Sequence, residues 1–331
     1  MNSITLHSPL DMHVHLRQDA MLHAIAPLTA RYFAGAVVMP NLLPPIDSTN
    51  KLQQYTSEIR QATRGYDFEP YMTLFFKDYS EQELLEAKDN IIGIKLYPAG
   101  ATTNSDNGVR EIGAMHPTFS CMEELGIPLL VHGETHGFVL DREQEFTAVY
   151  DHLARTYPKL IIVMEHITTA KAVEMLDKYD NLFATITVHH LMITLDDVVG
   201  GLMRPHLFCK PIAKRPEDRE ALLRVSLDAH PKVMFGSDSA PHPVSSKECP
   251  GCAAGIFTAP IALQLLASIF DSHSSLHNLQ AFVSDNARSI YGIHPPQTTV
   301  SLSKTSSLVP DTYNGVIPML AGEMLAWSVV P

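Results

Sequence analysis

Eight short apolar runs, separated by stretches of helical composition, constrain the fold of this chain more than any other feature. The runs cover residues 4–16, 35–40, 69–76, 91–97, 128–132, 160–166, 182–188 and 233–236. Helical stretches lie between them at residues 51–64, 80–88, 115–125, 169–179 and 216–229. Several runs are apolar throughout instead of alternating, which is typical of parallel strands that helices cover. Eight such strands predict a (β/α)8 barrel, with a doubly wound open sheet as the alternative.

The length of the chain allows either two average domains or one large barrel and does not choose between them. The chain has 331 residues, of which 45% are hydrophobic and 18% are charged, so it can build a sizeable core. After about residue 295 the sequence becomes less periodic and richer in Ser and Thr. We therefore expect residues 1–331 to form a single domain in which this C-terminal tail packs on the barrel.

Charge and cysteine content narrow the class of protein further. The net charge is -12, from 36 acidic and 24 basic residues, which argues against a nucleic-acid surface. No apolar run approaches the roughly 18 residues that a membrane span needs, and no signal peptide is evident before Asp11. Four cysteines in so long a chain fit a reducing compartment better than a disulfide framework. These features predict a cytoplasmic protein.

Side chains that can bind a metal ion stand at the ends of several runs. His13 and His15 come first; because alternate side chains of a strand share a face, we expect their Cα atoms about 6.6 Å apart on one side. Residues of the same kind stand in or just after later runs, namely Lys95, His132, His166 and Asp238. In a (β/α)8 barrel the carboxyl ends of the strands meet at one mouth, which holds the active site. Each residue alone has an ordinary structural explanation, but that explanation must be repeated at every strand end.

Lys95 is the most unusual member of this set, because it lies in the apolar run 91–97. A free ammonium is costly to bury, and 4 Å from a divalent ion it would be repelled by about 8 kcal/mol at an effective dielectric near 20. A lysine that reacts with CO2 to form a carbamate escapes this cost, and its two oxygens can bridge two metal ions. A lysine that extends out of the barrel mouth and a Schiff-base lysine are the alternatives.

Two further motifs receive a structural interpretation. Cys249 and Cys252 have the spacing of a zinc or redox pair, but no second pair accompanies them, and a turn at the intervening Pro-Gly explains them as well. His189 and His190 follow the seventh run. These histidines could be additional metal ligands, but we expect them to be loop residues, because the other ligands already fill two metal sites.

These residues together resemble the amidohydrolase superfamily and, within it, the dihydroorotase family in its separate bacterial or fungal form. The segments that carry the resemblance are Asp-Met-His-Val-His-Leu-Arg (11–17), Met-Pro-Asn (39–41), Ile-Lys-Leu-Tyr-Pro-Ala (94–99), Ala-Thr-Thr-Asn-Ser (101–105), Val-His-Gly-Glu (131–134), Glu-His-Ile-Thr (165–168) and Gly-Ser-Asp-Ser-Ala-Pro-His (236–242). They follow the family's order from residue 11 to about residue 260. Two departures, Gly100 and Lys210, lie outside the ligand positions.

The resemblance implies a binuclear zinc hydrolase with a barrel of the amidohydrolase type. By similarity, the first of two Zn²⁺ ions is held by His13, His15 and Asp238, the second by His132 and His166, and both are bridged by carboxylated Lys95 and a hydroxide. The implied reaction is the reversible opening of the cyclic amide of L-dihydroorotate to N-carbamoyl-L-aspartate in pyrimidine biosynthesis. The hydroxide would be the nucleophile and Asp238 the general acid and base. A homodimer is the family expectation.

The resemblance also implies how a carboxylated substrate is held. Arg17, two residues past His15, is a natural fork for the substrate carboxylate, although alone it would pass for a surface arginine. The other implied contacts are the side chains of Asn41 and His242, backbone groups at Lys210 and Ala254, and the hydroxyls of Thr102 and Thr103 on a mobile lid.

Three other functions remain open at this point. A hydantoinase or allantoinase would share the metal site but would lack the carboxylate clamp formed by Arg17, Asn41 and His242. A catalytically inactive scaffold would be expected to lose a ligand such as Lys95 or Asp238, and both are present. A Schiff-base aldolase built on Lys95 would be trapped by borohydride with a keto substrate.

Overall fold

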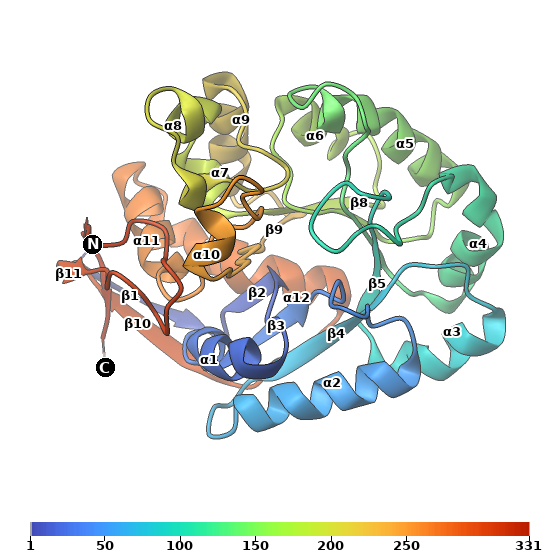
Figure 1. Cartoon of the computed structure of the whole chain (residues 1–331), viewed down its shortest axis with the longest axis horizontal. Coiled ribbons are helices and arrows are strands. Elements are labelled where there is room, and N and C mark those ends of the chain that lie inside the picture. The colour runs from blue at the N-terminus through green and yellow to red at the C-terminus, as the bar shows by residue number, and fades with distance from the viewer. Residues whose placement is uncertain (1, 331) are drawn as a thin grey trace.

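Eight parallel strands, hydrogen-bonded in chain order, form the centre of this computed structural model, which describes residues 2–330. They are β2 Leu10–Val14, β3 Gly35–Val38, β4 Glu69–Phe75, β5 Gly93–Leu96, β6 Leu129–Val131, β7 Ile162–Met164, β8 Leu182–Ile186 and β9 Val233–Phe235. The chain just after β9 returns to β2, where the backbone N–H of Asp238 donates to His13 (2.8 Å) and that of His15 donates to Ser239 (3.1 Å). The sheet therefore curls on itself (Figure 1), and the predicted (β/α)8 barrel is confirmed.

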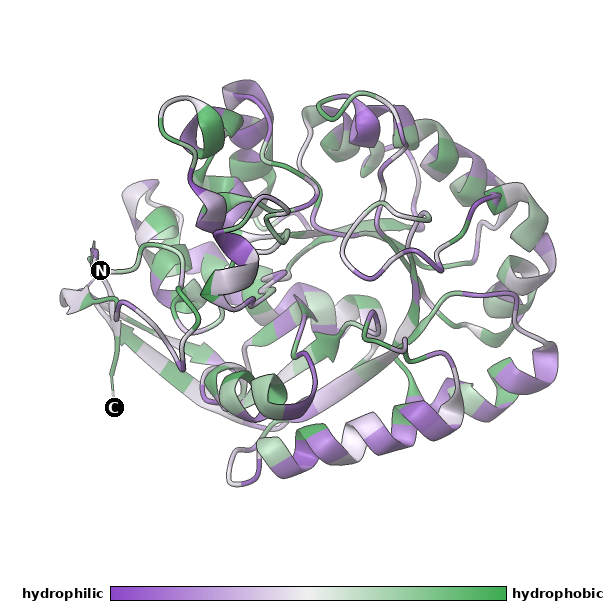
Figure 2. Ribbon diagram, viewed as in Figure 1, coloured by the Kyte–Doolittle hydropathy of each residue, from purple (hydrophilic) through white to green (hydrophobic). Residues whose placement is uncertain are grey.

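Helices surround the barrel and turn their apolar faces toward it (Figures 1 and 2). They are α1 Asp19–Ala30, α2 Thr49–Ala62, α3 Glu81–Ala87, α4 His116–Leu125, α5 Arg142–Thr156, α6 Ala170–Met175, α7 Val188–Met192, α8 Leu195–Val199, α9 Pro216–Leu227, α10 Val244–Lys247, α11 Ala262–Ser272 and α12 Asn286–Tyr291. In α2 the buried residues are Leu52, Tyr55 and Ile59, a spacing of three and four that makes one apolar stripe. The rest of this long helix faces solvent.

Successive strand residues belong to two different cores, which explains why the strand sequences are apolar throughout. Leu130 of β6 packs inside the barrel with Met12, Val163 and Met234. Its neighbours in the same strand point outward and join the larger core beneath the helices. A strand buried on both faces has no exposed side on which to place polar residues, so polar side chains are few within the strands, and the predicted metal ligands lie at or near the carboxyl ends.

The prediction that residues 4–16 form a single strand is wrong. The chain forms β1 Ser3–His7, reverses at Ser8, whose φ is 45°, and only then enters the barrel as β2. Strand β1 pairs antiparallel with β10 Thr299–Ser303, which also pairs with β13 Ser328–Val329. The C-terminal segment after residue 295 thus returns to the N-terminal strand beside the barrel, and a second small pairing joins β11 Ser307–Leu308 to β12 Met324–Leu325.

The prediction that His189 and His190 are loop residues is also wrong. Both lie in the short helix α7, directly after β8, and both are buried. The helix begins because the Thr187 hydroxyl accepts a hydrogen bond from the backbone N–H of His190 at 3.1 Å. A single capped turn of this length gives too little periodicity to be recognised in a sequence.

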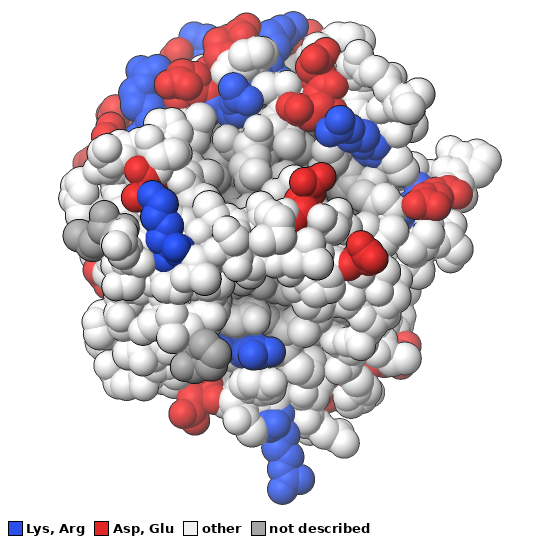
Figure 3. Space-filling model, turned by 90° about the vertical axis from the view of Figure 1, so that its left-hand side faces the viewer, with Lys and Arg blue, Asp and Glu red and all other residues white. Residues whose placement is uncertain are grey.

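The face of the molecule drawn in Figure 3 shows scattered charges of both signs with wide uncharged areas between them. This mixed distribution fits the acidic net charge of the chain and differs from the continuous basic stripe of a nucleic-acid-binding face. Among residues 2–330, none of the helices has both the length and the apolar composition that crossing a membrane requires.

Candidate active site

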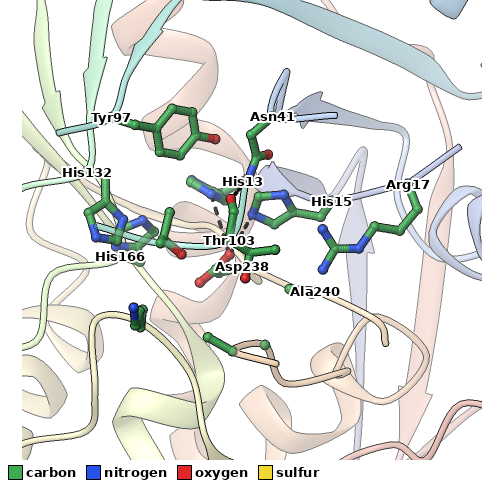
Figure 4. A pocket seen from close by; sticks show the side chains of 14 residues that line it. His13, His15, Arg17, Asn41, Tyr97, Thr103, His132, His166, Asp238 and Ala240 are labelled. Atoms are coloured by element: carbon green, nitrogen blue, oxygen red, sulfur yellow. Dashed lines mark hydrogen bonds and ion pairs between the residues drawn. The ribbon is translucent and has the colours of Figure 1, made fainter. Parts of the chain in front are cut away.

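The carboxyl ends of five barrel strands bring the predicted metal ligands to one mouth (Figure 4). The imidazole centroids of His13 and His15 are 5.4 Å apart. His166 lies between two other rings, 4.9 Å from the centroid of His13 and 4.8 Å from that of His132. All four histidines are therefore gathered around one small volume, although 153 positions separate the first from the last in sequence (166 − 13).

Asp238 lies against the first histidine pair. Its Oδ1 atom is 3.1 Å from Nε2 of His15 and 3.5 Å from Nε2 of His13. Burial alone would raise the pKa of Asp238, but the hydrogen bond from His15 and the proximity of the His13 and His15 rings outweigh it, so the pKa lies below its usual value. Asp238 is therefore ionised at neutral pH and presents a carboxylate to the cluster.

Lys95, in β5, is completely buried and its Nζ atom has no hydrogen-bond partner. Burial lowers its pKa to about 8, against the opposing charges of Glu165 and Asp238. The amine is thus much closer to its neutral form than an exposed lysine, as reaction with CO2 requires. Its Nζ atom lies 5.1 Å from the centroid of the Tyr97 ring.

Two carboxylates that the sequence analysis did not identify orient the ligand histidines. Nδ1 of His13 is 2.8 Å from Glu165, and Nε2 of His132 is 2.8 Å from Glu134. Each contact takes up one ring nitrogen as an N–H donor and leaves the other nitrogen free for a metal ion. Glu165 comes directly before His166, and Glu134 stands two residues after His132, so each is found by searching for carboxylates beside ligand histidines.

A third buried carboxylate ties β2 to the segment that carries Asp238. Oδ1 of Asp11 accepts hydrogen bonds from the backbone N–H groups of Ser237 (2.7 Å) and His13 (3.2 Å), and Oδ2 accepts one from the Ser237 hydroxyl at 2.5 Å. Burial raises the pKa of Asp11 to about 7 despite these bonds. Asp11 therefore serves to fix the positions of two neighbouring metal-ligand segments relative to each other.

The residues present fit a divalent metal centre. One ligand atom each from His13, His15 and Asp238 lie within 4.8 Å of one another. Two further atoms, Nδ1 of His166 and Nζ of Lys95, are buried without a hydrogen-bond partner, which costs about 1–3 kcal/mol each in a protein interior. Imidazoles with a carboxylate are ligands that zinc and neighbouring transition metals prefer. Burial also lowers the pKa of His13 and of His166 well below the usual value, so both rings are neutral and able to coordinate.

A small pocket opens beside these ligands, and most of the predicted substrate-binding residues line it. Its walls include Arg17, Asn41, Thr102, Thr103, Lys210 and Ala254, together with Tyr97, Ala240 and Gly255, which the sequence analysis did not identify. In Figure 4, Arg17 lies on one side of the His13–His15 pair, and His132 and His166 lie on the other. A small molecule bound in this pocket can therefore contact the Arg17 guanidinium at one end and the proposed metal-binding histidines at the other.

Arg17 does not continue the strand as the sequence pattern suggested. Strand β2 ends at Val14, and Arg17 has a φ of 61° in the loop that follows. Its guanidinium is directed into the cavity by donating from Nε to the carbonyl of Pro241 (2.9 Å) and from Nη2 to Nε2 of His242 (2.9 Å). His242, the one predicted substrate residue absent from the cavity walls, thus contacts the cavity through Arg17.

Asn41 joins the predicted lid to the barrel mouth. Its Nδ2 atom donates to the backbone carbonyl of Thr103 at 3.0 Å, and Nδ2 of Asn104 donates to the backbone carbonyl of Asn41 at 3.1 Å. The Oδ1 atom of Asn41 is buried without a partner, which leaves it free to accept a hydrogen bond from a ligand N–H group. The loop that carries Thr102 and Thr103 is therefore held over the cavity.

The sequence profile described as "Amidohydrolase family" matches residues 10–294. The chain belongs to the amidohydrolase family. This amidohydrolase is 44% identical to a protein named dihydroorotase from Helicobacter hepaticus, over 99% of this chain and 98% of that one. The crystal structure of a Campylobacter jejuni dihydroorotase matches 100% of the chain and 98% of that chain, with 52% identity and a TM-score of 0.95. The crystal structure of a Saccharomyces cerevisiae dihydroorotase in complex with 5-fluoroorotic acid matches 100% of this chain and 99% of that chain, with 33% identity and a TM-score of 0.93.

Proposed function

We propose that this amidohydrolase is a dihydroorotase, which opens the ring of L-dihydroorotate to N-carbamoyl-L-aspartate and closes it again in pyrimidine biosynthesis. The observation that carries the proposal is the guanidinium of Arg17 in the same cavity as the ligand histidines and Asp238. A cyclic amide that also bears a carboxylate fits such a cavity at both ends. Full-length similarity to proteins named dihydroorotase supports the same substrate.

The proposed cofactor is a pair of Zn²⁺ ions. The ligands would be His13, His15 and Asp238 for the first ion, His132 and His166 for the second, and carboxylated Lys95 between them. When bound, the ions would lower the pKa of a water molecule and polarise the amide carbonyl. The chain contributes the neutral imidazoles, the buried amine that accepts CO2, and the carboxylates of Glu134 and Glu165 that hold the rings in place.

Asp238 is the residue that moves the proton. As an ionised carboxylate, it would accept the proton of the attacking hydroxide and pass it to the ring nitrogen that leaves. In ring closure the same steps run in reverse, so one carboxylate serves as both acid and base. General acid–base catalysis of this kind contributes about 10²–10⁴-fold to the rate.

The substrate carboxylate is held by Arg17, with Asn41 and His242 completing the clamp. A guanidinium can offer two parallel N–H groups to a carboxylate, which fixes the orientation of the ring as well as its position. The remaining proposed contacts are the backbone at Lys210 and Ala254, and the hydroxyls of Thr102 and Thr103. Closure of the threonine loop excludes water, which ring closure needs because that step releases a water molecule.

Two further properties are proposed for the assembled enzyme. The chain functions as one barrel domain, because β10 and β13 bind the C-terminal segment to the N-terminal strand. Two copies associate as a homodimer. Sedimentation of the purified protein tests the second point directly, since a monomer at assay concentration would contradict it.

The proposed activity is tested by metal analysis combined with an assay of dihydroorotate hydrolysis. We expect two metal ions at the barrel mouth, turnover of dihydroorotate, and loss of turnover when a chelator removes the metal. The competing function, a hydantoinase or allantoinase, predicts comparable turnover of an uncharged hydantoin. Equal rates on dihydroorotate and hydantoin would reject the dihydroorotase assignment, because the Arg17 clamp would then have no role.

A further inference from the structure

A second cluster of metal-binding side chains lies outside the proposed binuclear centre. His189 and His190 come from α7, and Cys209 lies in the segment that brings Lys210 to the cavity. All three side chains are buried, and one ligand atom from each, a ring nitrogen or Sγ, lies within 4.8 Å of the others. The proposed reaction uses none of these three side chains.

His189 is the member of the cluster that the protein interior leaves unexplained. It is completely buried, and neither Nδ1 nor Nε2 has a hydrogen-bond partner. A neutral imidazole has one N–H donor and one lone pair, and each is destabilising when it is buried without a partner. Burial lowers the pKa of this ring to about 3, so its lone pair is not blocked by a proton at neutral pH. A metal ion is a partner that uses such a lone pair.

The spacing of the other ligand atoms fits a tetrahedral ion. Sγ of Cys209 lies 3.5 Å from Nε2 of His190. For Zn–S near 2.3 Å and Zn–N near 2.0 Å, tetrahedral geometry separates sulfur and nitrogen by about 3.5 Å. The carbonyl oxygen of Pro211 lies 3.1 Å from that nitrogen and accepts a hydrogen bond from the Cys209 thiol at 3.2 Å, and an ion bound between these atoms would replace both contacts.

The surroundings of His190 also suit a ligand. Its Nδ1 atom is 2.9 Å from the hydroxyl of Thr187. When Nε2 binds a metal ion, the single ring proton resides on Nδ1 and is donated to this hydroxyl, which fixes the ring orientation. Thr187 and the start of α7 follow β8 directly, so the barrel itself holds this side of the cluster.

We propose that His189, His190 and Cys209 bind an additional Zn²⁺ ion, with the Pro211 carbonyl or a water molecule as the fourth ligand. Two imidazoles and one thiolate form a ligand set that zinc favours. Binding converts the Cys209 thiol to a thiolate and releases its proton to solvent. Burial raises the pKa of this thiol to about 12, so the metal ion, and not the ambient pH, produces the thiolate.

This ion would act as a structural clamp beside the cavity. It would tie α7 to the segment Cys209–Pro211, whose central residue, Lys210, lines the cavity. The backbone of Lys210 would thereby be held at a fixed distance from the barrel mouth. His189, His190 and Cys209 are therefore positioning residues and do not touch the substrate.

Zinc stoichiometry tests the proposal without an activity assay. The purified protein is incubated with Zn²⁺, desalted and analysed for zinc by mass spectrometry. We expect the unchanged protein to retain one zinc ion per chain more than Cys209→Ser, and the same number as Cys121→Ser, which removes a cysteine on the distant helix α4. Equal zinc content in all three proteins would overturn the proposal.

Cobalt spectroscopy gives a second test that does not depend on the folding of a variant. The proposed binuclear ligands contain no sulfur, so a thiolate-to-cobalt charge-transfer band in Co²⁺-loaded protein must come from a cysteine. We expect this band in the unchanged protein, and we expect it to persist in the double variant Cys249→Ser, Cys252→Ser. The proposal would be overturned if the unchanged protein showed no such band. It would also be overturned if the band were present in the unchanged protein and absent from the double variant, because the thiolate would then come from Cys249 or Cys252. Either result leaves the proposed dihydroorotase activity untouched, because that activity is assayed separately.

Discussion

Nη2 of the Arg17 guanidinium lies 2.9 Å from Nε2 of His242, across 225 positions of sequence. The same Nε2 atom lies 3.0 Å from the backbone carbonyl oxygen of Ala254. It accepts from Arg17 in the tautomer that carries the proton on Nδ1, and donates to Ala254 in the other tautomer. The two residues belong to the loops after β2 and β9, the first and last strands of the barrel. The junction that closes the barrel thus also builds the proposed clamp for the substrate carboxylate.

Replacing Arg17 with Ala is expected to reduce kcat/KM for dihydroorotate by about 10- to 100-fold. Loss of a charge-assisted hydrogen bond costs about 1.5–3 kcal/mol, and each 1.36 kcal/mol corresponds to a factor of ten in rate. The metal content should not change, because the hydrogen-bond partners of the Arg17 guanidinium are Pro241 and His242, and neither is a proposed metal ligand. Steady-state kinetics and metal analysis on the same preparation measure both quantities.

The matched control for that experiment is Arg64→Ala, which removes an exposed arginine just after α2. We expect its kinetics to equal those of the unchanged protein. If Arg17→Ala were as active as Arg64→Ala, the carboxylate of the substrate would have to bind elsewhere.

The KM for dihydroorotate is expected to stay constant from about pH 8 down to about pH 5.5. Burial, followed by the charge of Arg17, lowers the pKa of His242 to about 3. The imidazole therefore stays neutral over this whole range and adds no positive charge beside Arg17, whereas an unperturbed histidine would protonate near pH 6.5. Initial rates over a series of substrate concentrations at each pH give KM. A several-fold change in KM centred near pH 6.5 would show that His242 titrates in the normal range.

The sequence predicted the residues at strand ends well because the barrel repeats one simple unit. Each strand is buried on both faces, so His132 and His166 stand out at the point where an apolar run stops. The partners of those histidines were harder to predict, because Glu134 and Glu165 acquire a role only when the ring orientation is known. Nothing in a sequence specifies a ring orientation.

Local backbone reversals account for the main errors of prediction. The run 4–16 looks continuous, but the positive φ of Ser8 divides it between two sheets. The positive φ of Arg17 likewise moves its side chain off the face that it would occupy in a strand. Ser and Arg seldom adopt the left-handed conformation, so the residue types at these two positions do not predict it. The contacts that stabilise these conformations come from residues far away in sequence, such as Pro241 and Pro296.

Replacing Glu165 with Ala is expected to weaken zinc binding at the barrel mouth by about 10- to 100-fold, the usual effect of removing the partner of a ligand histidine. The Nδ1 atom of His13 would lose its acceptor at 2.8 Å, and the ring would no longer be held toward the cluster. Glu165→Gln keeps an acceptor oxygen and should restore much of the affinity. Competition titration with a chromophoric chelator measures the effect, and Glu174→Ala, on the exposed side of α6, serves as the control. Equal weakening in Glu165→Gln and Glu165→Ala would indicate that the charge, and not the orientation of His13, is what matters.

Restoration of activity to the metal-free protein is expected to depend on bicarbonate. Lys95 is buried with an unpaired Nζ atom and a pKa of about 8, so its amine can react with CO2 and supply the carboxylate that two metal ions need. We expect protein depleted of metal and reconstituted with Zn²⁺ in CO2-free buffer to recover only a small part of its activity, and added bicarbonate to restore the rest. Lys95→Arg keeps the positive charge but forms no carbamate, so bicarbonate should have no effect on it. Full recovery of the unchanged protein without CO2 would show that Lys95 acts as a simple amine, and the bridging role assigned to it would then be wrong.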